Sequence, residues 1–412
     1  MVSKVTTYPI GGLYEGEQLP LDLTATHPDF RHDRKTVNAK YARGEVRIVT
    51  ESARYPLLSV VAMYSDNKKY VLNPDFQRRH RWDRTKQSRL IESFIMNVPI
   101  PPIFLYEVEF SKYEVMDGLQ RMTAIYEFYT DKFALTELEE WPELNGLRYS
   151  ELPDQVQKGI DRRYLSSIIL LQETAKTLHE AQRLKQLVFE RINSGGVQLE
   201  AQESRNAIYD GPLNRLCIAL ARNPYLCRMW DIPEPTAQEL ENGVQPDDVL
   251  RNETFRRMED VELVLRFFAY RQRLLHDQTA LNIYLDEFLR RGNDFGSPLL
   301  AKYKELFEQT VKLVYDVLGD DAFRLYRSRK TGWSWFDRPT KVVYEPVMYA
   351  FSQRLDRAGE LLAKADQIRK SLEGFYRENY GIFEGRKVNR ADLHARNEAV
   401  LGLLDSHLTA RG

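Results

Sequence analysis

The chain has 412 residues, which is enough for two or three domains with substantial hydrophobic cores. Its 59 basic and 60 acidic residues nearly cancel, so any contact with nucleic acid must come from a local patch. Cys217 and Cys227 are the only cysteines and the seven histidines are scattered, which argues against a disulfide framework and against a zinc site. The sequence shows neither a signal pattern nor an apolar run of membrane-spanning length, so we expect a cytoplasmic protein with no membrane partner.

The first part of the chain predicts an irregular arm that leads into a mixed domain. Residues 1–50 are polar and lack periodicity, and we expect an N-terminal arm there. A helix is predicted at 57–65. The segment that follows interleaves Phe76 and Trp82 with four arginines: Arg78, Arg79, Arg81 and Arg84. Asp83 is suited to cap a further helix with an apolar face of Leu90, Ile91, Phe94 and Ile95.

The most informative stretch is the turn between a strand predicted at 112–116 and a helix predicted at 119–129. Asp117 and Gly118 form this turn, where glycine permits a tight backbone and the close approach of a ligand. The N–H groups in the first turn of such a helix are a ready site for phosphate. Gln120 and Arg121 add an amide and a permanent cation to that turn, and Asp117 adds a carboxylate for a metal or a water.

The remaining patterns complete a mixed domain and then become helical. We expect a strand at 103–108, a helix at 153–162, a buried strand at 164–172 and a helix at 178–192 that ends in a glycine C-cap. Beyond residue 212 every pattern is helical. The predicted fold class is therefore α+β, with a mixed domain at 51–211 followed by an all-α domain at 212–412.

One segment of the helical part, residues 324–338, alternates basic with aromatic side chains. This alternation suits a nucleic-acid surface, with cations for phosphates and rings for exposed bases. A connection between helices, with its tryptophans packed inward and its arginines in water, is the plainer interpretation for a chain of net charge −1.

Five motifs in the first half occur in a characteristic order. They are Asn73-Pro74-Asp75-Phe76-Gln77-Arg78 with Trp82 after it, Leu90-Ile91-Glu92-Ser93, Val98-Pro99-Ile100-Pro101-Pro102, Asp117-Gly118-Leu119-Gln120-Arg121 and Phe189-Glu190-Arg191-Ile192-Asn193-Ser194-Gly195-Gly196. The series resembles the N-terminal-domain family of GmrSD-type restriction endonucleases, within the ParB/sulfiredoxin-like superfamily. The helical half is similar to the C-terminal region of stand-alone family members, and it shows no His-Asn-His nuclease pattern.

The resemblance implies a ParB/sulfiredoxin-like fold for the first domain. It also implies that this domain binds a nucleoside triphosphate and hydrolyses it at an Asp-Gly-Gln-Gln-Arg motif, with Mg²⁺ or another divalent cation. Family members act in bacterial defence against phage, often on modified DNA. Here Leu119 replaces the first glutamine of the motif, which removes one polar group from the expected pocket.

Candidate site residues follow from the turn and from the resemblance. The predicted catalytic residues are Asp117, Gln120 and Arg121, with Asp117 also as the metal ligand. The predicted nucleotide contacts are Arg78, Gly118, Arg121, Thr123, Asn193, Gly195 and Gly196. The predicted nucleic-acid contacts are Arg81, Arg327, Arg329, Lys330 and Trp333. The plainer alternatives are an Asp-Gly turn followed by a surface arginine, a solvated basic loop, and a helix C-cap at the two glycines.

These expectations leave three functional hypotheses open. The first is a nucleotide-dependent component of a restriction-type defence system that acts on DNA, with a separate nuclease or modification protein as a possible partner. The second is a DNA-reading or regulatory module that binds nucleotide without turnover. The third is a DNA-processing enzyme, a nuclease or a base-excising enzyme, whose site the sequence does not reveal. Oligomerisation is possible under each hypothesis.

Overall fold

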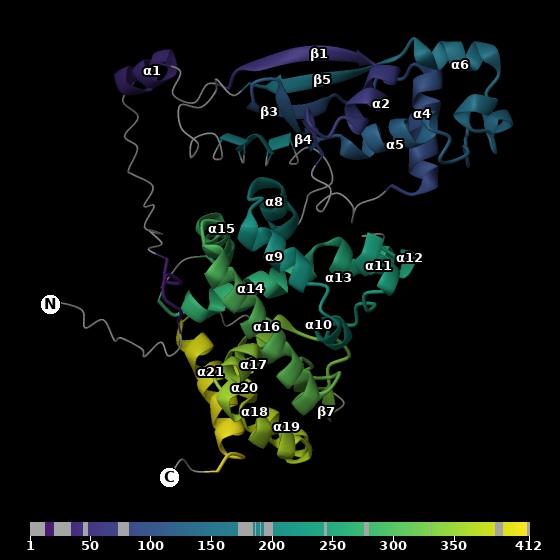
Figure 1. The fold of residues 1–412 in the computed structure, drawn as a ribbon. Helices are drawn as coiled ribbons and strands as arrows, with labels where there is room; N and C mark the ends of the chain where they lie inside the picture. Colours follow the sequence, from purple (N-terminus) through teal and green to yellow (C-terminus); the bar gives the residue numbers. More distant parts are fainter. Residues whose placement is uncertain are drawn as a thin grey trace. The chain divides into compact units, whose positions relative to one another are not determined.

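The computed structural model describes residues 13–19, 34–43, 48–72, 82–171, 184–185, 187–189, 191–192, 201–242, 245–275, 280–330, 332–383 and 390–409 (Figure 1). The chain divides into two compact units. One is His27–Ile208. The other combines Met1–Thr26 with Tyr209–Gly412.

The unit of residues 27–208 is built around a mixed five-stranded sheet with the strand order β1-β5-β3-β4-β2. Its strands are β1 (Thr50–Pro56), β2 (Tyr70–Val71), β3 (Ile103–Glu109), β4 (Lys112–Asp117) and β5 (Tyr164–Leu170). Its helices are α1 (Arg34–Arg43), α2 (Leu57–Ser65), α4 (Arg84–Met96), α5 (Leu119–Tyr129), α6 (Asp154–Asp161) and α8 (Ala201–Ile208). β1 with β5 and β3 with β4 are antiparallel pairs, whereas β3 with β5 and β2 with β4 are parallel.

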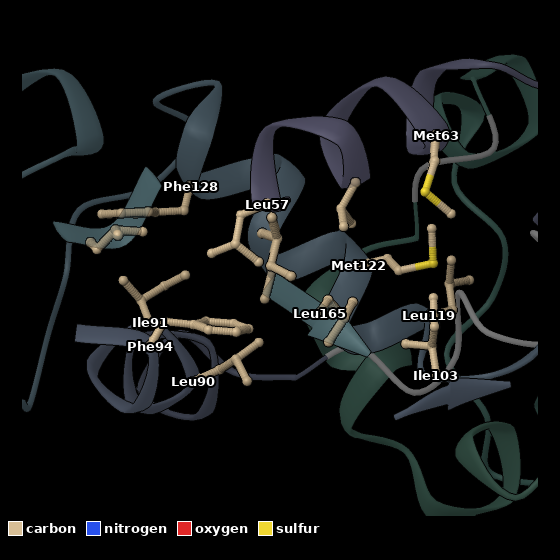
Figure 2. Close-up of a cluster of buried hydrophobic side chains, with 14 of the residues drawn as sticks. Leu57, Met63, Leu90, Ile91, Phe94, Ile103, Leu119, Met122, Phe128 and Leu165 are labelled. Atoms are coloured by element: carbon tan, nitrogen blue, oxygen red, sulfur yellow. The ribbon is translucent and has the colours of Figure 1, made fainter. Parts of the chain in front are cut away.

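The hydrophobic core of this unit lies between the sheet and helices α2, α4, α5 and α6. Leu57, Val60 and Met63 recur every three residues along α2, so that helix presents one apolar stripe to the core. Alternate residues of the strands, such as Ile103 and Leu105 of β3, supply the sheet's side of the same core. Figure 2 shows Ile103 beside Leu119 at one end of this cluster, and Phe128 at the other.

The second unit is helical apart from one hairpin. Its helices are α9 (Pro212–Leu220), α10 (Pro224–Met229), α11 (Ala237–Asn242), α12 (Asp247–Arg251), α13 (Glu253–Arg256), α14 (Glu259–Arg273), α15 (Leu281–Gly292), α16 (Ser297–Leu318), α17 (Lys341–Ser352), α18 (Ala358–Ala363), α19 (Ala365–Glu378), α20 (Tyr380–Phe383) and α21 (Arg390–Asp405). Helix α14 is buried on nearly every side and packs against α9, α15, α16 and α17, so it forms the centre of this unit. Across the described residues we find no helix long and apolar enough to cross a membrane.

The predicted fold class, α+β followed by a helical region, is confirmed. The helices predicted at 57–65 and 119–129 have those bounds in the structure. The sequence analysis did not predict the hairpin of β6 (Tyr326–Arg329) and β7 (Gly332–Trp335), which interrupts the helical part within the stretch that alternates basic and aromatic residues.

Candidate functional site

The junction between β4 and α5 is a tight turn that only glycine fits. Gly118 has a φ of 97°, in the left-handed region. A Cβ at this position would lie 2.3 Å from Cγ2 and 3.2 Å from Cα of Ile103, which is fully buried on β3. Both the backbone angle and the available space therefore require the glycine, and the turn predicted from Asp117 and Gly118 is present.

Arg121, one turn into α5, is bonded back to the end of β4. Its Nη2 donates to Asp117 Oδ2 at 2.7 Å, and its Nη1 donates to the backbone carbonyls of Pro101 and Pro102. The Arg121 side chain is 11% exposed, whereas that of Asp117 is 39% exposed. Three acceptors thus fix the guanidinium, and the carboxylate is the member of the ion pair that solvent or a ligand reaches more easily.

Gln120 connects the junction to the arginine-rich segment. Its Oε1 accepts a hydrogen bond from the backbone N–H of Trp82 at 3.2 Å. Trp82 is the first described residue of that segment, and it packs partly buried against the core. The structure therefore brings the end of one predicted motif into contact with another.

Thr123 has its hydrogen-bonding partner elsewhere. Its hydroxyl donates to the hydroxyl of Tyr64 on α2 at 3.4 Å. Tyr64 in turn stacks on Tyr126, with ring centroids 4.4 Å apart. This contact lies between α5 and α2, so Thr123 is joined to α2 and has no contact with the Asp117–Arg121 pair.

A second ion pair anchors the helical stretch around Lys185 to β4. Residues 184–185, 187–189 and 191–192 are helical, and Lys185 Nζ lies 2.7 Å from both carboxylate oxygens of Glu114 on β4. Lys185 also lies over the ring of Tyr106, 5.9 Å from its centroid. Burial raises the pKa of the Tyr106 phenol, and the nearby Glu114 carboxylate raises it further. The stretch that precedes the predicted Asn193 loop is thereby tied to the strand that ends at Asp117.

Leu119 is the position at which this chain departs from the expected motif. Its side chain is only 7% exposed and belongs to the hydrophobic core beside Ile103 (Figure 2). The substitution therefore adds apolar contact to the core, and it leaves the Asp117–Arg121 pair untouched.

The other predicted residues fall into two groups. Arg78, Arg81, Asn193, Gly195 and Gly196 lie outside the described residues. Arg327, Arg329, Lys330 and Trp333 lie on the β6–β7 hairpin of the other compact unit.

Sequence analysis missed the partners that hold the site together. The carbonyls of Pro101 and Pro102 belong to a motif that the sequence analysis used only for the family resemblance. Trp82 contributes its backbone N–H, which no side-chain pattern reveals. The one available signal was that all three residues lie within motifs of the same ordered series.

The donors at the junction are compatible with a hard divalent cation that takes most of its ligands elsewhere. Within the parts of the chain that the structure describes, no three His, Cys, Asp or Glu side chains gather in a metal-binding group. Mg²⁺ commonly uses one or two protein carboxylates and completes its shell with water and substrate phosphates. Asp117, whose side chain is 39% exposed, offers a carboxylate of this kind.

The domain is a mixed α/β domain. Its turn from β4 to α5 requires Gly118 and is held by the Asp117–Arg121 ion pair. Residues 60–209 match the family model described as GmrSD restriction endonuclease, N-terminal domain. This part of the chain is a domain of that family, as its motifs predicted, and the match points to a component of a restriction- or defence-type system. No curated protein and no solved structure matches the chain.

Proposed function

We propose that this chain is the nucleotide-dependent component of a restriction-type system, and that the β4–α5 junction binds and hydrolyses a nucleoside triphosphate. The observation that carries the proposal is the arrangement of Arg121. An isolated surface ion pair of this spacing contributes only about 0.3–0.5 kcal/mol. Here the guanidinium also binds two proline carbonyls, so the structure holds Asp117 in one orientation at the first turn of a helix, where phosphate binds readily.

Each described residue of the junction then has a defined task. Asp117 holds the divalent cation, Arg121 orients Asp117, and Gly118 lets the phosphates approach the backbone. A bound divalent cation would neutralise part of the charge on the phosphates. Arg121 keeps two further N–H groups, one on Nη2 and one on Nε, that have no acceptor among the described residues.

The order of the motifs along the chain also supports the β4–α5 junction as the nucleotide site. The motif that begins at Asn73 ends at Trp82, whose backbone N–H binds Gln120. The predicted Asn193 loop follows the helical stretch that Lys185 ties to β4. The resemblance assigns both motifs to nucleotide binding. One motif is therefore anchored on α5 through Trp82, and the other follows a stretch anchored on β4 through Lys185.

Asp117→Asn tests the proposal, because asparagine keeps a hydrogen bond to Arg121 and removes the charge. We expect the affinity for a fluorescent nucleoside triphosphate in Mg²⁺ to fall roughly tenfold or more, as expected for a charge-assisted contact of about 1.5–3 kcal/mol. The readout is fluorescence anisotropy, with and without a chelator, because the variant should also lose most of the Mg²⁺ dependence.

The matched control is Glu127→Gln on the same helix. Glu127 likewise pairs with an arginine, Arg84, at 2.6 Å, but it lies at the other end of α5. Equal affinities in the parent and both variants would rule out the junction as the nucleotide site.

A second candidate, nucleotide binding without turnover, is favoured by one contact. The Gln120 oxygen that would position a water accepts the Trp82 N–H in this structure. Phosphate release from each of the four triphosphates, with and without duplex DNA, separates the two candidates. Binding with no release under any of these conditions would support the second.

A further inference from the structure

The alternating basic and aromatic residues of the β6–β7 hairpin lie on two different faces. Side chains alternate along a strand, and cross-strand partners lie on the same face. Tyr326 is paired with Trp335 and Ser328 with Trp333, so these residues share one face. The opposite face carries Arg327 and Arg329, each paired with a small residue of β7, Ser334 or Gly332.

The aromatic face contacts the rings of α19 and α20, although Trp335 remains 36% exposed. Tyr326 is buried, stacks on Trp333 at 5.8 Å and accepts a hydrogen bond from Arg377 on α19 at 3.0 Å. Trp333 meets the ring of Tyr380 at 5.1 Å, and Trp335 meets that of Tyr376 at 5.9 Å. The rings that the sequence offered as a stacking platform therefore anchor the hairpin on α19 and α20, as the plainer interpretation expected for the tryptophans.

The opposite face gathers three cations on one ring. The guanidinium carbons of Arg327, Arg329 and Arg338 lie 4.0, 5.6 and 5.4 Å from the ring centroid of Phe336, which follows β7. We call these four residues the cationic face. A cation over an aromatic ring contributes about 0.5–1 kcal/mol at an exposed site, which offsets part of the repulsion between three like charges.

No acid balances this charge among the described residues. None of the three arginines has an ion-pair partner there, and Nε of Arg327 is buried without an acceptor. Asp337, which separates Phe336 from Arg338 in the chain, is exposed and makes no ion pair with them. Arg324, just before the hairpin, differs in that it pairs with Asp321 at 2.8 Å and with Asp231 at 3.2 Å.

We propose that the cationic face binds the phosphate backbone of duplex DNA, an assignment of partner that rests on the restriction-type role proposed above. Guanidinium groups match phosphate oxygens with paired donors, and a duplex presents its charges more densely than a single strand. Because Trp333 and Trp335 already contact the rings of Tyr380 and Tyr376, binding depends on phosphates and not on stacking with bases. Because the net charge of the chain is only −1, DNA binding requires a local concentration of positive charge, and the cationic face provides one.

The test compares the full-length protein with Arg327→Gln/Arg329→Gln/Arg338→Gln, using a fluorescein-labelled duplex of arbitrary sequence without nucleotide. We expect the affinity at low salt to fall at least roughly tenfold. The slope of log K against log salt should become shallower by about 2 to 3, since each lost phosphate contact removes about 0.9. Arg329→Glu alone, at an exposed position, should reproduce most of the loss without risk to folding.

The matched control is Lys304→Gln/Lys312→Gln/Arg369→Gln, which removes the same charge from cations of the same unit that already pair with acids. Its DNA affinity should stay within about twofold of the parent. An equal loss in this control, an unchanged salt slope in the triple variant, or no duplex binding by the parent would overturn the proposal.

Three further measurements identify the kind of partner and show whether DNA binding is independent of nucleotide binding. A labelled single strand should bind no tighter than the duplex, and tighter binding that Trp335→Ala abolishes would instead indicate base stacking. Poly-glutamate should compete weakly, and strong competition would indicate an acidic protein as the partner. Asp117→Asn should bind DNA like the parent, so a failure of nucleotide binding leaves this readout unaffected.

Discussion

At the scale of single residues, the junction depends on one glycine and one ion pair. Gly118 allows β4 to turn directly into α5 above Ile103, and Arg121 then reaches back to Asp117 and the proline carbonyls. Ile103 therefore belongs to the hydrophobic core and also limits the space at the turn of the candidate site. A change at Gly118 should therefore disturb stability and ligand binding together.

Gly118→Ala should destabilise the protein by about 2–5 kcal/mol. The left-handed backbone accounts for about 1–2 kcal/mol, and the contact of the new methyl group with Ile103 adds about 1–3 kcal/mol. Urea unfolding followed by circular dichroism measures the sum. Gly146→Ala is the control, since Gly146 has a φ of +88° but no atom within 4 Å of an added Cβ. If both variants lose the same stability, the clash with Ile103 is not significant.

At the scale of elements, α4 shows how a helix can organise a loop through buried polar side chains. Glu92 is buried, and its Oε1 accepts the backbone N–H groups of Glu140 at 2.9 Å and Trp141 at 3.0 Å. One turn earlier, Ser88 Oγ accepts the N–H of Thr136 at 3.0 Å. The apolar side of α4 faces the core, while this polar side fixes a loop that has little regular structure of its own.

Glu92→Ala should loosen that loop locally. Two backbone donors then lose their acceptor, and an unsatisfied buried donor costs about 1–3 kcal/mol. Hydrogen exchange at the amides of Glu140 and Trp141 should accelerate strongly, while amides in α5 keep their protection. Glu92→Gln retains an acceptor oxygen and should show much less acceleration. Equally fast exchange in both variants would assign the effect to the charge and not to the acceptor.

Much of the mixed domain could be predicted because its signals are local. Helices α2 and α5 have their predicted bounds since apolar spacing and flanking turns fix both ends. The β6–β7 hairpin was missed because basic and aromatic residues alternating with a period of two were interpreted chemically, although that period also indicates a strand. The acceptors of Arg121 were missed because they are backbone atoms about twenty residues away, which no side-chain pattern identifies.

At the scale of the whole molecule, an N-terminal segment belongs to the same compact unit as the C-terminal helices. Residues 13–19 pack onto α14, where the fully buried Glu17 forms two hydrogen bonds with Arg271, at 2.5 and 2.9 Å. Gln272 binds the same segment through the carbonyl of Glu17 and the N–H of Leu19. The domain of residues 27–208 is therefore an insertion between two parts of one compact unit.

Glu17→Ala should destabilise the helical unit by about 3–5 kcal/mol, because it leaves the buried guanidinium of Arg271 without its carboxylate. Thermal unfolding followed by tryptophan fluorescence, to which Trp230, Trp333 and Trp335 of that unit contribute, measures the change. Glu15→Ala is the control, since Glu15 is exposed in the same segment and should change stability by less than about 0.5 kcal/mol. Equal effects of the two variants would mean that the buried Glu17–Arg271 pair is not what stabilises this contact.

This arrangement sets an order of events on the ribosome. Glu17 is translated early, but Arg271 follows 254 residues later, a delay of roughly 13 to 50 s at the usual rates of synthesis. Throughout that interval the leading segment has no docking surface, while the inserted domain is completed and free to fold. The helical unit therefore completes its packing only after the whole inserted domain has been synthesised.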